Sequence, residues 1–346
     1  MELREMMIHL GEAAGPSGCE GGALRVAEEL LRPYVDDARL DVMGNLIALK
    51  RCAKPAAPTV MLDAHMDEIG LIITGYEKGF LRFHALGGVD PRMLPALEVK
   101  LLTEEPMYGV IDTLPPHLLD AEEREKPLAA DKLYIDVGLD EDAVRRLVPL
   151  GTAAVFASRV GRLGENRLCG KSMDDRSCVA VLIRALQLLE GEELNCHVAL
   201  LLAAQEELGC RGAVTGAYAV SPEAAIAVDV THGQSPDAPK SETFVLGGGP
   251  AIGVGPNINR AVSDKLISLA KAAEIDVQIE VLPGHSGTDA WPIQVSREGV
   301  ATGVLSLPLR YMHTPLEVLD LRDAESCARL LALWLADYGK EGALNA

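Results

Sequence analysis

Hydrophobic and polar positions change their spacing twice along the chain. Apolar residues have helical spacing over 21–34, 178–189, 263–273 and 321–338. Short apolar runs typical of buried strands lie at 59–62, 196–204, 224–228, 252–254, 277–281 and 303–307. Residues 40–48 are typical of two strands around a Gly-Asn turn. This alternation of helices and strands predicts an α/β domain.

The middle of the chain has a different pattern. Short β-like runs follow one another at 71–74, 80–83, 97–102, 108–111, 133–137 and 153–156, with Gly and Pro between them. Closely spaced short strands predict a small barrel or sandwich, and the polar stretch 120–126 is expected to be a surface loop. We therefore expect an α/β domain built from residues 1–70 and 164–346, interrupted by a β insert of residues 71–163.

Composition excludes several classes of partner. A formal net charge of −19 argues against nucleic acid, because phosphate binding needs clustered Lys and Arg. Aromatic residues are only 4% of the chain, which disfavours stacking on bases or sugars. No apolar run approaches the roughly 18 residues of a membrane span, and the charged start at residues 1–5 does not support a signal peptide. Seven scattered cysteines predict reduced thiols in a cytoplasmic protein.

Two adjacent acids, Glu206 and Glu207, follow the apolar run 198–204. An unpaired carboxylate at the end of a buried strand would be expected to take up a proton. Metal ions are a common means of keeping such groups ionised. One acid can then bind a metal while its neighbour accepts a proton from water. Asp229 follows the apolar residues 225–228 in the same way, and two strands that end in acids favour one shared site.

Further candidate ligands follow other predicted strands. His65 and Asp67 come after the strand 59–62, and residues two apart in an extended chain point the same way. Asp67 can therefore hydrogen-bond the ring of His65, or a group near it, which is how a carboxylate orients a metal-bound imidazole. Asp174 lies in an acidic segment at 171–176, and His313 follows the strand 303–307. Together these side chains predict a metal-dependent hydrolase.

Three other chemistries compete with this interpretation. Residues 164–172 approach a phosphate-binding loop, but five residues separate Gly164 from Gly170 where that loop has four. A phosphate-loop ATPase therefore stays a weak alternative. Glu206 with another acid would also suit a glycoside hydrolase. Residues 284–290 resemble a nucleophile elbow without its final glycine, which indicates a tight turn near the site and no serine nucleophile.

Taken in order, these segments resemble the dinuclear metallo-aminopeptidases of peptidase family forty-two, clan MH, the tetrahedral aminopeptidases. The resemblance extends over almost the whole chain and is carried by residues 15–18, 63–70, 87–91, 115–119, 133–138, 171–176, 205–213, 287–290 and 311–320. It implies a three-layer α/β/α zinc-peptidase-like catalytic domain with an inserted PDZ-like β-barrel that serves dimerisation. The chain departs from the family pattern at Cys178 and Ser286, where Gly is usual.

The resemblance also implies roles for single residues. Asp174 would bridge two divalent ions, with His65 and Asp229 completing one site and Glu207 and His313 the other. Glu206 would be the general base and Asp67 the residue that orients His65. A cis peptide bond is implied after Asp174.

The function implied is a cytoplasmic aminopeptidase that removes N-terminal residues from short peptides. Zinc is the expected metal, with cobalt or manganese as alternatives. The expected assembly is a homo-oligomer based on dimers, which in this family extends to a tetrahedral dodecamer, without nucleic-acid or membrane partners. A relative that keeps the fold but only binds peptides is the remaining alternative.

Overall fold

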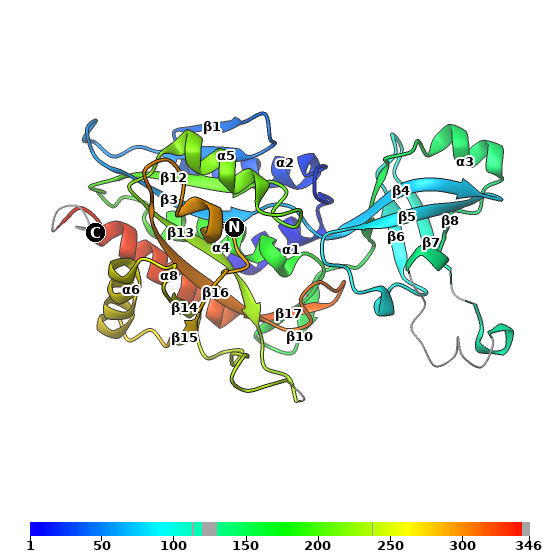
Figure 1. Cartoon of the computed structure of the whole chain (residues 1–346). Coiled ribbons are helices and arrows are strands. Elements are labelled where there is room, and N and C mark those ends of the chain that lie inside the picture. Colours follow the sequence, from blue (N-terminus) through cyan, green and yellow to red (C-terminus); the bar gives the residue numbers. More distant parts are fainter. Residues whose placement is uncertain (113, 120–129, 237, 341–346) are drawn as a thin grey trace.

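The computed structural model describes residues 1–112, 114–119, 130–236 and 238–340. A layered α/β part holds both ends of the described chain, and a small β-barrel stands to one side of it (Figure 1). The stretch 120–126, expected to be a surface loop, lies outside the described residues. Within the described chain, no helix is both long and apolar enough to cross a membrane.

A mixed sheet of eight strands forms the middle layer of the α/β part. Its spatial order is β1 (Asp37–Leu40), β2 (Leu46–Lys50), β12 (His197–Ala203), β3 (Thr59–His65), β13 (Ala224–His232), β16 (Ala301–Leu309), β14 (Ala251–Val254) and β15 (Gln278–Val281). The four central strands, β12, β3, β13 and β16, run parallel to one another. Their carboxyl ends therefore meet at one edge of the layer.

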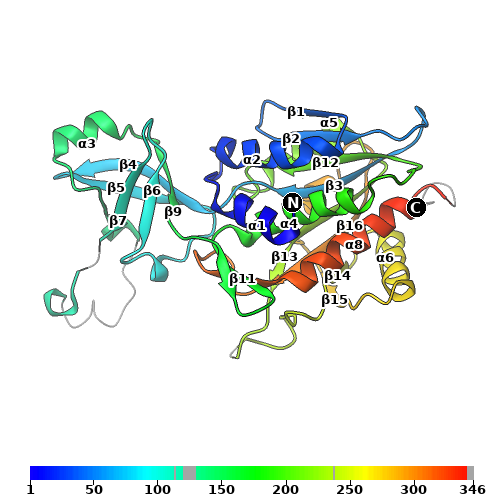
Figure 2. The same cartoon turned by 180° about the vertical axis from the view of Figure 1, so that it is seen from behind.

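Helices cover both faces of this sheet (Figures 1 and 2). One face packs against α1 (Leu3–Glu12), α2 (Gly21–Leu31), α4 (Met173–Leu188), α6 (Arg260–Ala272) and α8 (Leu321–Asp337). The other face packs against α5 (Arg211–Val220) and the short α7 (Ala290–Ile293). The predicted three-layer α/β/α arrangement is confirmed.

The β insert closes into a barrel with its own apolar core. Its strands, in spatial order, are β4 (Gly70–Glu77), β5 (Phe80–Leu86), β8 (Ile135–Asp136), β7 (Met107–Ile111), β6 (Glu98–Leu101) and β9 (Ala153–Phe156). It also carries α3 (Glu141–Leu147) and the 3-10 turns η2 (Pro91–Met93), η3 (Pro116–Leu118) and η4 (Ala130–Lys132). Closure leaves the six strands no free sheet edge.

A three-stranded sheet lies between the barrel and the start of α4, and its last strand leads directly into α8. It consists of β10 (Gly161–Leu163), β11 (Arg167–Gly170) and β17 (Glu317–Asp320). Elsewhere in the α/β part, the 3-10 turn η1 (Arg32–Tyr34) directly follows α2. β11 pairs with β17 through Gly170 and Glu317. This pairing brings the acids at the start of α4 close to the loop that carries His313.

Two predicted boundaries were wrong in ways that matter for the site. The helix expected from residue 178 reaches back to Met173, but Asp174 and Asp175 both have non-helical backbone angles and form a kinked turn at its start. Negative charge is favoured at that end of a helix. The strand expected to end at residue 228 continues to His232, because its β-branched residues remain buried, and Asp229 lies inside it.

Candidate metal centre

Strand alternation directs three polar side chains to one face of the sheet. On β3, Asp63 and His65 alternate with Leu62 and Ala64, which belong to the core under α4. Asp63 and His65 therefore face the side covered by α5 and α7. Asp229 on β13 faces the same side, as do its apolar neighbours Ala225 and Ala227.

Asp174 lies between the two histidines that the sequence singled out. Its Oδ1 is 3.0 Å from Nε2 of His65, and its Oδ2 is 3.3 Å from Nε2 of His313. The same nitrogen of His313 is 3.4 Å from Oε1 of Glu207. The peptide bond from Asp174 to Asp175 is cis, as the resemblance implied. Two imidazoles and two carboxylates, distant in sequence, thus converge on one point.

Two sets of side chains at this point could each hold a metal ion. One set is His65, Asp175 and Asp229, and the other is Asp174, Glu207 and His313; within each set the ligand atoms lie within 4.8 Å of one another. Imidazole and carboxylate donors suit zinc, cobalt and manganese. Sequence reasoning did not assign Asp175, whose carboxylate lies behind His65 and accepts a hydrogen bond from the His65 backbone N–H at 3.3 Å.

The electrostatics fit bound cations. Burial, together with the charge of Asp174, raises the pKa of Glu207 to about 8. Burial raises the pKa of Asp229 well above its usual range. Asp63 and Asp289 are buried carboxyls that face each other, and burial raises the pKa of both well above the usual range. Such groups are costly unless a positive charge or a proton compensates them. The donor set and the surplus of buried acid therefore fit two divalent ions.

Asp67 supports the site from beneath. Its carboxylate accepts hydrogen bonds from Ser17 Oγ at 2.5 Å and from the backbone N–H groups of Glu206 and Glu207 at 2.9 and 3.1 Å. Nδ1 of His65 is 3.1 Å from the Asp67 carbonyl oxygen and 3.4 Å from its Oδ1. The pattern predicted contact between Asp67 and the His65 ring. It gave no sign that Asp67 also holds the two glutamates.

Glu317 is a supporting residue that sequence reasoning missed. One of its carboxylate oxygens accepts from the backbone N–H of Asp174 at 3.1 Å, and the other accepts from that of His313 at 2.9 Å. It is 2% exposed. The available signal was an acid four residues after His313 at the start of a short apolar run.

A cavity of about 420 Å³ opens onto these side chains. It is lined by residues of both sets together with Glu206, Cys210, Gly88, His285 and Met312. Gly88 follows β5 and packs directly on His313. Within the loop 284–290, His285 stacks on Trp291 with ring centroids 4.4 Å apart, and Ser286 exchanges hydrogen bonds with Thr288. The predicted tight turn therefore forms one wall of the cavity.

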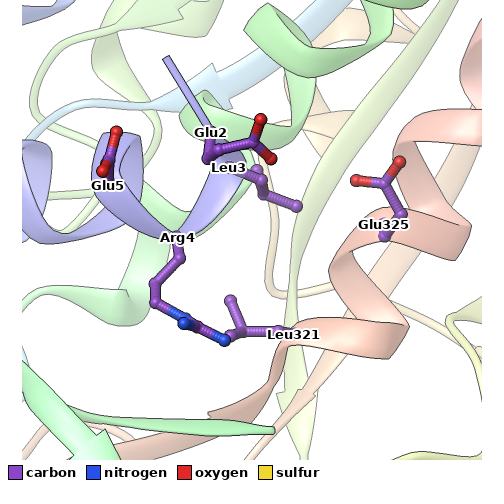
Figure 3. A pocket seen from close by; sticks show the side chains of 6 residues that line it. All are labelled: Glu2, Leu3, Arg4, Glu5, Leu321 and Glu325. Carbon is purple, nitrogen blue, oxygen red and sulfur yellow. The ribbon is translucent and has the colours of Figure 1, made fainter.

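A second cavity, of about 340 Å³, lies between the start of α1 and α8 (Figure 3). Glu2, Glu5 and Glu325 line it, but Arg4 lies among them and Arg184 pairs with Glu325 at 2.9 Å. Mixed charges of this kind are typical of a solvated surface. The first cavity is thus the better candidate for chemistry.

The structure does not support a phosphate-binding loop. Lys171 is 4% exposed, and its ammonium donates to Glu68 at 2.7 Å and to Ser172 at 3.0 Å. A lysine engaged in this way is not free to meet a phosphate.

Comparisons with known proteins identify the family of this chain. The family model of M42 glutamyl aminopeptidases matches residues 44–330. The lysyl aminopeptidase of Pyrococcus furiosus is 38% identical, and the match covers 94% of each chain. An aminopeptidase structure from Desulfurococcus kamchatkensis superposes with a TM-score of 0.90 at 36% identity, covering 97% of this chain and 94% of the other.

A second similar structure is the TET1 peptidase of Pyrococcus horikoshii, which is described as assembling into a tetrahedron or a large octahedral shell. It has a TM-score of 0.85 and 31% identity over 96% of this chain and 99% of its own. The chain accordingly belongs to the M42 glutamyl aminopeptidase family of metal-dependent peptidases.

Proposed function

We propose that this protein is a two-metal aminopeptidase that removes N-terminal residues from short peptides. The observation that carries the proposal is the position of Asp174, whose two carboxylate oxygens each face one imidazole, His65 on one side and His313 on the other. A carboxylate placed in this way suits a bridge between two ions.

In the proposed centre, Asp174 would be shared, His65 and Asp229 would complete one ion site, and Glu207 and His313 would complete the other. Asp175, which lies within reach of the same ion site as His65 and Asp229, would support His65 by accepting a hydrogen bond from its backbone N–H. Zinc is the preferred metal, and cobalt or manganese would also suit these donors. When bound, the two ions supply Lewis acidity to the scissile carbonyl and lower the pKa of the attacking water. The free amine of the substrate would complete the polar contacts, which explains a preference for N-terminal residues.

Glu206 is the proposed general base. Its side chain lines the cavity but belongs to neither of the two ligand sets. Burial raises the pKa of Glu206, which makes it a stronger base and suits a group that accepts a proton from water. The protonated carboxyl then gives that proton to the leaving amine nitrogen. The Asp67 carboxylate accepts a hydrogen bond from the backbone N–H of Glu206 and so positions that residue. Asp67 also orients the ring of His65 through its backbone carbonyl oxygen.

Two matched variants separate the base from a ligand. Glu206→Gln should keep both metal ions and lose about 10²–10⁴-fold in turnover, because only the proton acceptor is gone. Glu207→Gln should lose metal as well as turnover. Metal analysis and peptide hydrolysis on the same samples decide between them. Equal metal loss in both variants would contradict this division of roles. If the wild-type protein binds peptides but does not hydrolyse them, the chain is instead a peptide-binding relative.

Catalysis and assembly are proposed to belong to different parts of the chain. Residues 1–70 and 164–346 form the proposed catalytic domain, and residues 71–163 the proposed dimerisation insert. Large apolar side chains are exposed on the insert, with Tyr108, Leu118 and Leu150 each 58% exposed or more. Assembly of the TET1 peptidase into closed shells supports dimers that build a tetrahedral dodecamer here. All seven cysteines are free, which suits the reducing cytoplasm.

Light scattering tests the assembly. The wild-type protein should have a mass several times that of one subunit, and Tyr108→Asp in the insert should reduce it. Val295→Asp, which replaces an apolar residue 73% exposed in the catalytic part, is the matched control. A wild-type monomer, or equal dissociation by both variants, would contradict the proposed role of the insert.

A further inference from the structure

Glu280 is a half-buried acid on β15, an edge strand of the eight-stranded sheet, and two hydroxyl groups hold its carboxylate in place. Thr231 Oγ1 donates to one carboxylate oxygen at 2.6 Å, and Ser306 Oγ donates to the other at 2.8 Å. Thr231 is 5% exposed and Ser306 is 1% exposed. Among the described residues, no lysine, arginine or histidine pairs with Glu280. The carboxylate is therefore fixed in position but has no counter-charge.

The register of the sheet places this carboxylate beside the proposed metal centre. Ser306 on β16 is the lateral partner of Asp229 on β13, so the two side chains point to the same face. Thr231 lies two residues beyond Asp229 on β13 and also points to that face. Neighbouring strands lie about 4.8 Å apart. A carboxylate that accepts from both hydroxyls therefore stands next to Asp229, within the length of one amino-acid side chain from the proposed centre.

The cavity over the centre offers nothing that would hold a negatively charged side chain. Its described lining contains no lysine and no arginine. His65 and His313 are proposed metal ligands, and a ligating imidazole nitrogen carries no proton. The remaining histidine, His285, accepts the backbone N–H of Gly287 at its Nδ1 at 3.0 Å, so its ring is neutral. An acidic N-terminal residue would meet carboxylates here without a cation to pair with.

We propose that Glu280 determines specificity, and that the enzyme prefers peptides whose N-terminal residue is lysine or arginine. This preference rests on the proposed aminopeptidase function, in which the substrate amine and the scissile carbonyl lie at the metal centre. The side chain of the first residue then extends past Asp229 toward Glu280. Each carboxylate oxygen of Glu280 accepts one hydroxyl and keeps a further lone pair. An ammonium or guanidinium group can donate to it in a charge-assisted hydrogen bond.

A purely structural role for Glu280 gives a different expectation. A carboxylate that only ties β15 to the central strands would affect the stability of the fold and would act equally on all substrates. Recognition of a positive charge acts only on substrates that carry one. Substrates that differ in charge alone therefore distinguish the two roles.

Aminoacyl coumarin amides of lysine and norleucine provide such a pair, because norleucine has the same unbranched chain without the ammonium group. The metal-loaded wild-type protein should cleave the lysine substrate with a kcat/KM at least about tenfold above that for norleucine, as expected for a hydrogen bond between charged groups. Arginine should likewise exceed citrulline, its uncharged analogue. Glutamate should be the poorest of the five substrates.

Glu280→Gln removes the negative charge and keeps the shape of the side chain. It should lower kcat/KM for lysine by at least about tenfold, mainly through KM, and leave the norleucine value nearly unchanged. Thr231→Val should lower the lysine preference by a smaller factor, because Ser306 still holds the carboxylate. Glu242→Gln is the matched control, since it removes an exposed acid that lines a separate pocket beside Met312 and should change no ratio.

The possible outcomes keep this inference apart from the proposed function. Failure of metal-loaded protein to hydrolyse any of the five substrates would refute the aminopeptidase function itself. Hydrolysis that favours norleucine or glutamate over lysine would keep that function and overturn the role of Glu280. Equal losses on lysine and norleucine in Glu280→Gln would also overturn it and leave Glu280 as a structural tie. If Glu280→Gln does not fold, the wild-type comparison and Thr231→Val still decide.

Discussion

At the scale of single residues, the close approach of Gly88 to His313 is a sharp steric constraint on the centre. A Cβ atom on Gly88 would lie 2.4 Å from Nδ1 of His313 and 2.8 Å from its Cε1. The Gly88 carbonyl oxygen is also 3.2 Å from that Nδ1. Gly88, two residues after β5, therefore fixes the ring orientation that turns Nε2 toward Asp174 and Glu207. This explains why a Gly-Gly pair in the insert belongs to the site.

Gly88→Ala should displace the His313 ring and weaken the ion held by Glu207 and His313. We expect about 10–100-fold weaker binding of one metal ion, because supporting contacts to metal ligands are worth that much, together with a parallel fall in turnover. Metal titration with competing chelator measures the affinity. Gly161→Ala is the matched control, since its added Cβ meets no atom within 4 Å. Unchanged metal affinity in Gly88→Ala would show that the ring is not held by this contact.

At the scale of elements, Glu68 ties three segments together behind the site. It follows β3, and its carboxylate accepts from Lys171 Nζ at 2.7 Å before α4 and from Arg176 Nη2 at 3.2 Å within α4. It also accepts from the backbone N–H of Gly15 at 3.0 Å, in the link between α1 and α2. All three charged side chains are buried. Glu68 therefore fixes how the helix carrying Asp174 meets the strand carrying His65.

Glu68→Ala should destabilise the fold by about 3–5 kcal/mol, because it leaves two buried cations without their counter-charge. Burial alone would raise the pKa of Glu68, but Lys171 and Arg176 outweigh it and hold the pKa below its usual range. Its stabilisation is thus complete above about pH 4.3, the ordinary unfolded pKa, and is lost as the pH falls through the folded value.

Chemical denaturation of both proteins across acidic pH measures this difference. The gap between wild type and Glu68→Ala should be largest at neutral pH and should shrink on acidification. Glu28→Gln breaks an exposed pair with Arg32 and should cost less than about 1 kcal/mol. A gap of that small size for Glu68→Ala would mean that the buried network does not hold the segments together.

The same elements show how far sequence alone reaches. Short apolar runs and helical spacing identified the strands of the eight-stranded sheet, four of the long helices and the β insert, but not α1 or the three-stranded sheet. The resemblance gathered the side chains that meet at Asp174. α5 escaped notice because its buried positions are Gly and Ala, which give weak periodicity. Glu317 and Asp175 also escaped, because their roles depend on the pairing of β11 with β17 and on the turn that opens α4. Such long-range pairings leave no local pattern.

At the scale of the whole molecule, the acidic centre links stability to pH. Burial raises the pKa of Glu207 to about 8, and the hydrogen bond to Asp174 raises that of His313 to about 9. Without metal, the folded protein therefore binds more protons at these groups than the unfolded chain does. Both shifts have the same consequence. As the pH rises, the free energy of unfolding decreases over the range in which the folded state holds more protons than the unfolded chain. For Glu207 this window begins at about pH 4.3 and for His313 at about pH 6.5.

Chelation should consequently lower the melting temperature, and the loss should grow as the pH rises from about 5 to about 8. Bound ions take the place of the protons, so reloaded protein gains stability by mass action and depends less on pH. Thermal unfolding of chelated and reloaded samples, measured in parallel at each pH, gives the difference directly. Glu207→Gln should reduce the difference in melting temperature between chelated and reloaded protein, whereas the exposed variant Glu28→Gln should leave that difference unchanged. A difference that stays constant or shrinks toward alkaline pH would mean that these buried acids are not where the metal binds, because ions that replace protons must matter more as protons become scarce.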